Sequence, residues 1–297
     1  LRLLAIDYSV YDSLEINTSR CTYAEPFTLI LLASQLAFIR SKHNNLKLIL
    51  RYNRNSDFFG WAGHLGYWQL IGFPLGNPVN MAQPSSNNYI PVQSINIAEL
   101  RTTAGNAPVG PIVKKMSERL AATLCGGQSQ QLHNLFEYCF REIMRNAAEH
   151  SGGNKITVIF QVWPALNETE IVVCDDGVWI AETLYDNDYI DCTNNLEALK
   201  FALLPGISRA SLEARCSEDE WGNSGFGLYF TSRICGNKGI FRMISGNDGL
   251  TLSNGLQTHH ENWKQKGTLV HMRIKHEDGL AQLLKLGEIH VEGKQEL

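Results

Sequence analysis

Glu142 and Asn146 are the first residues whose types and spacing suit a chemical task. They lie in the stretch 130–150, where apolar residues recur at helical spacing. Positions four apart in an α-helix are offset by only about 40°, so both side chains, together with Glu149, are expected on one helix face. Asn146 can offer a neutral oxygen to Mg²⁺, which prefers oxygen ligands, and Glu142 can orient or deprotonate an attacking water or hydroxyl. A solvated helix face without a chemical role is the alternative.

A second candidate site follows the apolar run 171–174, which ends in Asp175-Asp176-Gly177. A carboxylate at the end of a buried strand can accept a hydrogen bond from the exocyclic amine of adenine. The glycine lets the backbone approach a ring closely. Strands that end in Asp-x-Gly are common, so this segment alone does not identify a nucleotide site.

A glycine-rich loop precedes a predicted helix and reads Gly222-Asn223-Ser224-Gly225-Phe226-Gly227-Leu228. Glycines free backbone N–H groups to point inward, and the N-terminus of a helix is a natural phosphate site. The loop does not fit the dinucleotide fingerprint, because no strand immediately precedes it, and it lacks the lysine of a P-loop. Taken alone, it is a weak indication of phosphate binding.

The order and spacing of these segments together resemble the GHKL ATPases, the family of histidine kinases, heat-shock chaperones, gyrase and the mismatch-repair protein MutL. Small bacterial anti-sigma serine kinases share the first motif most closely. The resemblance covers 128–275, about half of the chain. The matching motifs are Glu142-x-x-x-Asn146-Ala147-x-x-His150 (N box), Val173-x-Asp175-x-Gly177 (start of the G1 box), Gly222-x-Ser224-Gly225-x-Gly227-Leu228 (G2 box) and the closing Gly267-Thr268.

The resemblance implies an ATP site that uses Mg²⁺. It implies that Glu142 is the catalytic base and that Asn146 holds the metal. It assigns Asp175 and Gly177 to adenine and places Thr268 near the adenine pocket. The remaining cofactor-binding residues that it implies are Ser224, Gly225, Gly227 and Leu228, which line the phosphates, and it makes residues 181–221 a lid that includes 206–209.

Trp179 is a departure from the family pattern, because the G1 box has a second glycine at this position. An indole there could narrow the pocket, stack on the base or weaken nucleotide binding. The sequence leaves these three outcomes open.

The elements that must position these residues are predicted from periodicity and from turn residues. Helices followed by mostly antiparallel strands predict an α+β chain, whose C-terminal part is a two-layer α/β sandwich; the resemblance implies the Bergerat-type ATP-binding fold. Segment 175–223 is predicted to be loop-like. The predicted helices are 26–39, 112–124, 130–150 and 225–234, and the predicted strands are 1–8, 46–50, 90–97, 155–162, 170–174, 240–245 and 267–274.

Two domains are expected, because the chain has 297 residues and is rich in proline and glycine around 102–111. A small α/β domain would occupy 1–105 and the ATP-binding domain 106–297. Strand, helix and strand at 1–50 predict a βαβ unit with parallel strands. With the stretch 66–73, this order resembles the STAS-like fold of anti-sigma antagonists. Those antagonists expose a serine at a strand-helix turn, whereas this turn reads Tyr23-Ala24-Glu25-Pro26.

The composition excludes several classes of protein. The net charge of −4 gives no electrostatic case for a nucleic-acid partner. No run of about 18 uncharged apolar residues predicts a membrane span. Seven scattered cysteines without a C-x-x-C pair predict reduced thiols rather than a disulfide or zinc framework. We therefore expect a cytoplasmic protein.

The expected function is a two-domain regulatory ATPase or protein kinase that couples its nucleotide state to a protein partner of anti-sigma or antagonist type; a homodimer is also compatible with the motifs. A non-catalytic, nucleotide-gated binding module is the first alternative, if Trp179 blocks the pocket or Glu142 points away. The second alternative is an ATP-driven clamp, which normally needs a long C-terminal dimerisation region. The third is a sensor histidine kinase, which needs a phosphoacceptor helix pair; His133 lacks the dimerisation-helix pattern that surrounds a phosphoacceptor histidine.

Overall fold

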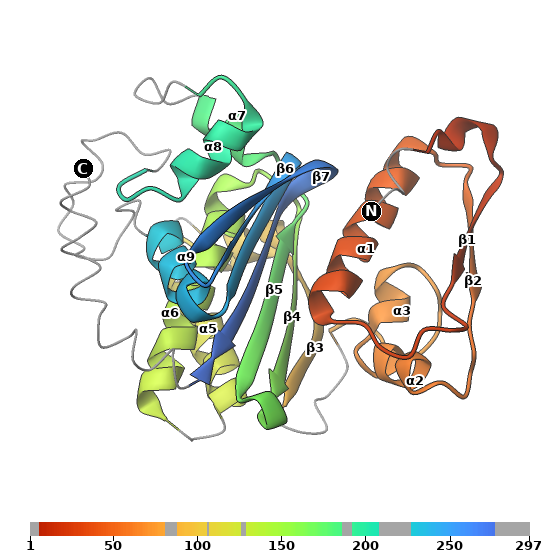
Figure 1. The fold of residues 1–297 in the computed structure, drawn as a ribbon, viewed down its shortest axis with the longest axis horizontal. Coiled ribbons are helices and arrows are strands. Elements are labelled where there is room, and N and C mark those ends of the chain that lie inside the picture. Colours follow the sequence, from red (N-terminus) through yellow and green to blue (C-terminus); the bar gives the residue numbers. More distant parts are fainter. Residues whose placement is uncertain are drawn as a thin grey trace.

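An antiparallel five-stranded sheet forms the centre of the second half of the chain (Figure 1). The computed structural model describes residues 6–80, 88–105, 107–125, 129–185, 192–207 and 227–276. The strands lie in the order β3-β4-β5-β7-β6. Their bounds are β3 (Tyr89–Asn96), β4 (Lys155–Trp163), β5 (Glu168–Asp175), β6 (Ile240–Ser253) and β7 (Leu256–Lys275). With its helices, the chain is mixed α+β, as predicted.

Helices cover both faces of this sheet. Figure 1 shows α5, α6 and α9 on one side and α1 on the other. Side chains alternate between the faces of a strand, and in β5 Ile171 and Val173 pack in the core of α5, α6 and α9, whereas Val172 and Cys174 pack with α1. The second half of the chain thus places its own helices on one face of the sheet, and α1 from the first half covers the other face. The helices are α1 (Pro26–Lys42), α2 (Asp57–His64), α3 (Tyr67–Leu70), α4 (Ile97–Ala104), α5 (Gly110–Cys125), α6 (Gln130–His150), α7 (Ile180–Tyr185), α8 (Asn195–Ala202) and α9 (Gly227–Lys238).

The long helix α6 has the bounds that its sequence predicts. Ser129 caps it, because its side chain accepts a hydrogen bond from the backbone N–H of Leu132. One face is buried against the sheet, and Gly152, just beyond the helix, takes a left-handed φ of +63°. The predicted apolar set is buried and consists of Leu132, Leu135, Phe136, Cys139, Phe140, Ile143 and Ala147.

The N-terminal part contains the predicted βαβ unit. β1 (Ser13–Asn17) and β2 (Lys47–Arg51) pair in parallel, and α1 lies between them in the sequence. Pro26 occupies the first turn of α1, where a backbone N–H would have no partner within the helix. The strand expected at 1–8 is not found where the chain is described: Tyr8–Val10 form a 3₁₀-helix, and residues 1–5 lie outside the described part.

A buried polar contact fixes the start of α1 on the sheet. The Phe27 N–H donates to Glu170 Oε1 over 3.1 Å, and His271 Nε2 lies 3.2 Å from the same oxygen. Arg242 stands over the Phe27 ring, 4.5 Å from its centroid. These groups hold α1 in one position on the second face of the sheet.

The strand β3, which the sequence assigns to the N-terminal domain, pairs with β4 from Tyr89↔Gln161 to Asn96↔Lys155. The helix α4 that follows contributes Ile97 and Leu100 to the core around α6. The boundary expected at 105 therefore falls inside the body that is built on the large sheet.

Segment 175–223 was predicted to be loop-like, but its described part contains α7 and α8.

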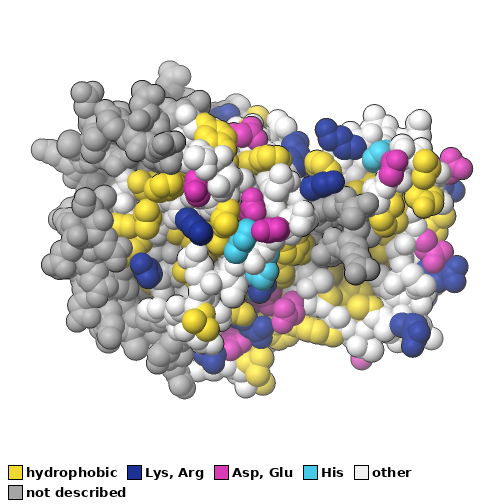
Figure 2. Space-filling view, turned by 45° about the horizontal axis from the view of Figure 1, so that its top comes forward, with side chains coloured by type: hydrophobic (Ala, Val, Ile, Leu, Met, Phe, Trp, Pro, Cys, Tyr) yellow, Lys and Arg dark blue, Asp and Glu magenta, His cyan; other side chains and the backbone are white. Residues whose placement is uncertain are grey.

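On the face shown in Figure 2, Lys and Arg side chains are scattered among acidic and apolar ones rather than gathered in one patch. Among the described residues, no helix has the length and apolar character that a membrane span requires.

Candidate functional site

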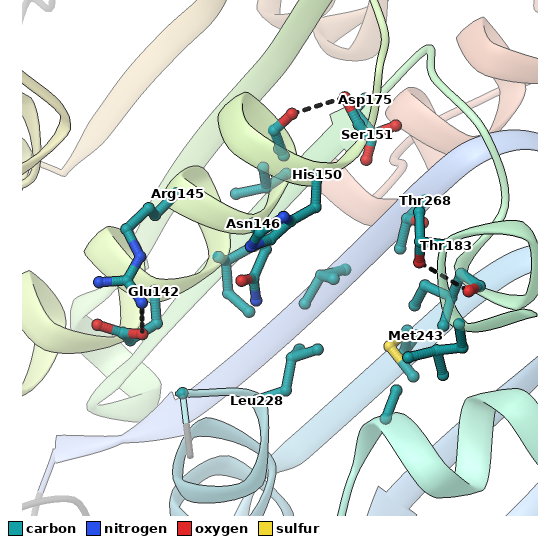
Figure 3. Close-up of a pocket in the computed structure, with 18 of the residues that line it drawn as sticks. Glu142, Arg145, Asn146, His150, Ser151, Asp175, Thr183, Leu228, Met243 and Thr268 are labelled. Atoms are coloured by element: carbon teal, nitrogen blue, oxygen red, sulfur yellow. Dashed lines mark hydrogen bonds and ion pairs between the residues drawn. The ribbon is translucent and has the colours of Figure 1, made fainter. Parts of the chain in front are cut away.

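A pocket lies between α6, the end of β5, the part of β7 around Thr268 and the start of α9 (Figure 3). The space between its walls is about 1120 Å³ when the open solvent at its mouth is included. Its wall is mostly apolar with a few polar groups. The lining residues are Glu142, Ile143, Arg145, Asn146, Ala147, His150, Ser151, Val173, Asp175, Val178, Ile180, Thr183, Leu184, Ala202, Ile207, Gly227, Leu228, Met243, Thr268 and Val270.

Asp175 is a buried carboxylate of this pocket and lies at the end of β5. Burial raises its pKa to about 7, and the backbone N–H groups of Gly177 and Thr268, which donate to it, oppose the shift. The Gly177 N–H lies 2.9 Å from Oδ1. A carboxylate held in an apolar wall can accept a further hydrogen bond from a ligand amine, and that bond would favour its ionised form.

Two glycines allow the backbone to close around Asp175. A Cβ on Gly267, whose φ is +68°, would come within 2.3 Å of the Asp175 carbonyl oxygen. A Cβ on Gly177 would come within 2.1 Å of the carbonyl oxygen of Ser151, which follows α6. Gly177 therefore packs the end of β5 onto the end of α6 and lies beside the pocket rather than in its wall.

Thr268 is tied to the lid segment through Ser245. The Thr268 hydroxyl lies 3.1 Å from Ser245 Oγ, which donates to the carbonyl of Gly267 over 3.0 Å. Ser245 Oγ in turn accepts from the N–H of Ile180 over 3.0 Å. One hydroxyl thus connects β7 with the start of α7. Nothing in the sequence singled out Ser245, because the bond depends on strand pairing.

Asn146 points into the pocket from the C-terminal third of α6 (Figure 3). Within the described part of the chain, its side-chain amide makes no hydrogen bond, so its carbonyl oxygen is available to a ligand or a metal ion. The described residues hold no group of three or more His, Cys, Asp or Glu side chains that could bind a metal. A metal at Asn146 would therefore take most of its ligands from a bound molecule and from water.

Glu142 is buried and lies one turn before Asn146. Its Oε1 is 3.3 Å from Arg141 Nε, and its Oε2 is 3.5 Å from an Arg145 nitrogen. Arg145 also lies 3.7 Å from Glu149, so its guanidinium is shared between two carboxylates. Glu142 is in the pocket wall as predicted, but both of its oxygens face guanidinium groups.

The indole of Trp179 lies outside the pocket. It packs on Gly246 of β6, where a Cβ would come within 2.8 Å of Trp179 Cδ2 and 3.1 Å of Asn195 Oδ1. Gly246 stands at an irregularity in the pairing of β6 with β7, and its φ of +62° favours glycine. Because the indole is directed to this site, it does not narrow the pocket.

The described part of the expected lid forms one wall of the pocket. Ile180, Thr183 and Leu184 come from α7, and Ala202 and Ile207 come from the end of α8 and beyond. Gly227 and Leu228 of the glycine-rich loop are also in the wall. The predicted site residues Ser224 and Gly225 lie outside the described residues, as does the lid segment 208–221.

Arg145, Ser151 and Met243 line the pocket but were not among the predicted site residues. Arg145 directly precedes Asn146, so its position beside the motif was a usable signal. Ser151 directly follows α6, and its hydroxyl donates to the Ala147 carbonyl over 2.6 Å. Met243 carries no signal, because a buried strand residue looks the same in any sheet.

The pocket thus combines the buried carboxylate of Asp175, the available amide of Asn146 and a wall that is mostly apolar. Glu142 and Arg145 form a charged pair at its other end. No protein-family model, no curated protein and no solved structure matches this chain. What the site can do therefore follows from its own residues.

Proposed function

We propose that the chain is a regulatory protein of the GHKL type that binds ATP with Mg²⁺ in a Bergerat-type fold and acts as an ATPase or protein kinase. One observation carries the proposal: a single pocket gathers Glu142, Asn146, Asp175, Gly227 and Thr268 from four segments of the chain. Each of these residues belongs to a different position of the motif set, and their meeting in one cavity supports the proposal.

Asp175 and Thr268 form the adenine end in this proposal. The buried Asp175 carboxylate accepts the exocyclic amine, and the apolar wall contacts the faces of the ring. Val173 and Met243 belong to that wall. Trp179 lies on Gly246 instead, which leaves room for the base.

The phosphate end lies toward Glu142 and Gly227. Glu142 and Ser151 are separated by nine positions of helix, or about 13 Å, and Figure 3 shows Glu142 and Asp175 far apart along α6. This separation suits an extended nucleoside triphosphate. The N-terminus of α9 at Gly227 supplies backbone N–H groups that favour phosphate.

Asn146 stands between these ends and fits a Mg²⁺ ion that is held mainly by phosphates and water, which is how this ion is commonly bound. Its amide makes no hydrogen bond within the described residues, so its oxygen is available. When bound, the ion neutralises charge on the phosphate oxygens. The role of Asn146 is to fix the ion, and with it the phosphates, relative to Glu142.

The role of Glu142 distinguishes two candidate functions. As a base it would orient or deprotonate a water or a hydroxyl of a protein substrate. Its contacts with Arg141 and Arg145 favour the second candidate, a non-catalytic module that only switches with nucleotide, unless bound phosphate draws the guanidinium groups away. The chemistry of the catalytic proposal requires this exchange of partners.

A protein partner would bind at the lid, so that its binding depends on the nucleotide state. Large apolar side chains are exposed on and beside it, at Val178, Tyr185 and Leu204. Exposed apolar side chains can contribute to a protein-binding surface. We assign the regulatory partner, of anti-sigma or antagonist type, to this region.

Titration of the wild-type chain with ATP, with and without Mg²⁺, followed by assay of phosphate release, tests the proposal. Binding that requires Mg²⁺ together with turnover, or transfer to a partner protein, supports an ATPase or kinase. Tight binding without turnover supports the nucleotide-gated module. A chain that binds no ATP contradicts both.

A further inference from the structure

A bulge in β7 places Thr268 in the pocket wall and Gly267 against Asp175. In the pairing of β6 with β7, Gly246 lies opposite Gln265 and Ser245 lies opposite Thr268. Lys266 and Gly267 are therefore extra residues on β7. A bulge of this kind bends the strand and redirects the residues beside it, and here it brings Gly267 against the backbone of Asp175.

Gln265 holds this bulge with its side-chain amide. Its exposed fraction is 1%. Its Nε2 donates to the Lys266 carbonyl over 2.7 Å and lies 3.6 Å from Cys174 Sγ. One amide nitrogen thus contacts both the bulge and the residue that precedes Asp175, and these two segments are the ones that shape the adenine end.

The oxygen of the same amide is held from α1. Ser34 Oγ donates to Gln265 Oε1 over 2.9 Å, and Gln35 Nε2 donates to it over 3.3 Å. Gln35 is fully buried. If these donors were lost, the buried amide oxygen of Gln265 would be left without a hydrogen bond, which is unfavourable. The orientation of Gln265 therefore depends on α1.

We propose that Gln265 is a positioning residue for adenine recognition, and that α1 sets it through Ser34 and Gln35. The N-terminal part of the chain is then a working component of the nucleotide site, since its helix holds the bulge that presents Gly267 and Thr268 to Asp175. The inference rests on the proposed ATP function and extends it by giving the N-terminal part a role in selecting the base.

The test compares ATP with purine riboside triphosphate, which lacks only the 6-amino group. In the wild type, the hydrogen bond from this amino group to a carboxylate should make ATP bind about tenfold or more tightly. The variants are Gln265→Met and Ser34→Ala, and binding is measured by titration calorimetry with Mg²⁺ present. Melting temperature reports folding separately.

Each variant has a matched control in the same element. Gln257→Met changes an exposed glutamine of β7, and Ser41→Ala removes a hydroxyl of α1 that donates to the Phe38 carbonyl. Ser34 makes the equivalent bond to Leu31 and, in addition, the bond to Gln265. The serine pair therefore isolates the contact between α1 and Gln265.

We expect the preference for ATP to fall about three- to tenfold in Gln265→Met and Ser34→Ala, and to stay at the wild-type value in both controls. A merely structural role would lower the melting temperature and leave the preference unchanged. If Gln265→Met does not fold, Ser34→Ala carries the test.

The outcomes separate the two proposals. Wild type that does not bind ATP, or that binds both triphosphates equally, overturns the adenine assignment and this inference with it. Wild-type discrimination that persists in both variants overturns the inference alone. Loss of discrimination in Gln265→Met but not in Ser34→Ala overturns the role of α1.

Discussion

Gly227, the first residue of α9, lies directly against the carboxylate of Glu142: a Cβ on Gly227 would come within 2.3 Å of Glu142 Oε2. The contact places a buried negative charge at the N-terminus of a helix, where the exposed N–H groups and the helix dipole stabilise it. The same helix end is the proposed phosphate site. Glu142 therefore adjoins the position where the terminal phosphate would lie, and only glycine at 227 leaves it room.

Glu142→Gln tests whether this carboxylate is a base. The substitution keeps the size of the side chain and removes its basic oxygen, so ATP affinity should be retained and turnover should fall about 10²–10⁴-fold. The measurement is phosphate release, with phosphotransfer to candidate partners, for wild type and variant side by side. Glu149→Gln, two turns further along α6 and also beside Arg145, is the control and should retain turnover. Equal rates for Glu142→Gln and wild type would reject the base assignment.

Asn146→Ala tests the metal role. The side-chain amide makes no hydrogen bond within the described residues, so its loss should leave the melting temperature unchanged. Affinity for ATP in Mg²⁺ should fall about ten- to a hundredfold, as expected for a lost contact with a charged group. Titrations with and without Mg²⁺ measure it, and Asn134→Ala on the same helix is the control. A variant that keeps the wild-type dependence on Mg²⁺ would remove Asn146 from the metal site.

Much of this site was predictable because it depends on local pattern. The bounds of α6 follow from its apolar spacing and from Ser129 as a cap, and the same spacing placed Glu142 and Asn146 on the pocket side. Asp175 was predictable as a polar residue at the end of an apolar strand. Signals of this kind lie within a few residues of the position they describe.

The features that could not be predicted depend on contacts between distant segments. The role of α1 as a cover for the second face of the sheet was hinted at only by the unbroken apolar runs of β4 and β5, which are typical of strands buried on both faces. The direction of the Trp179 indole depends on Gly246. The long β6–β7 hairpin extends through polar residues to a turn at Asn254-Gly255, a pair that favours tight hairpins.

The pH dependence of stability should report the burial of Asp175. Its pKa rises from 3.8 to about 7 in the folded chain, so the folded state favours the protonated form. The stability that this group contributes is complete below about pH 4 and is lost as the pH rises to about 7. Urea unfolding of wild type and Asp175→Asn should therefore diverge across this range, with the variant gaining about 2–4 kcal/mol relative to wild type. Parallel pH profiles would show that Asp175 titrates normally.

Titration calorimetry of ATP against wild type, Asp175→Asn and Asp176→Asn tests the central claim most directly. Asp176 is the matched control, because this neighbouring carboxylate accepts from the N–H groups of Asn154 and Lys155 over 2.8 and 2.9 Å and lies outside the pocket wall. The proposed adenine contact predicts that Asp175→Asn weakens ATP by about 1–3 kcal/mol, whereas Asp176→Asn binds like wild type. Wild-type affinity in Asp175→Asn, or an equal loss in both variants, would contradict the nucleotide site.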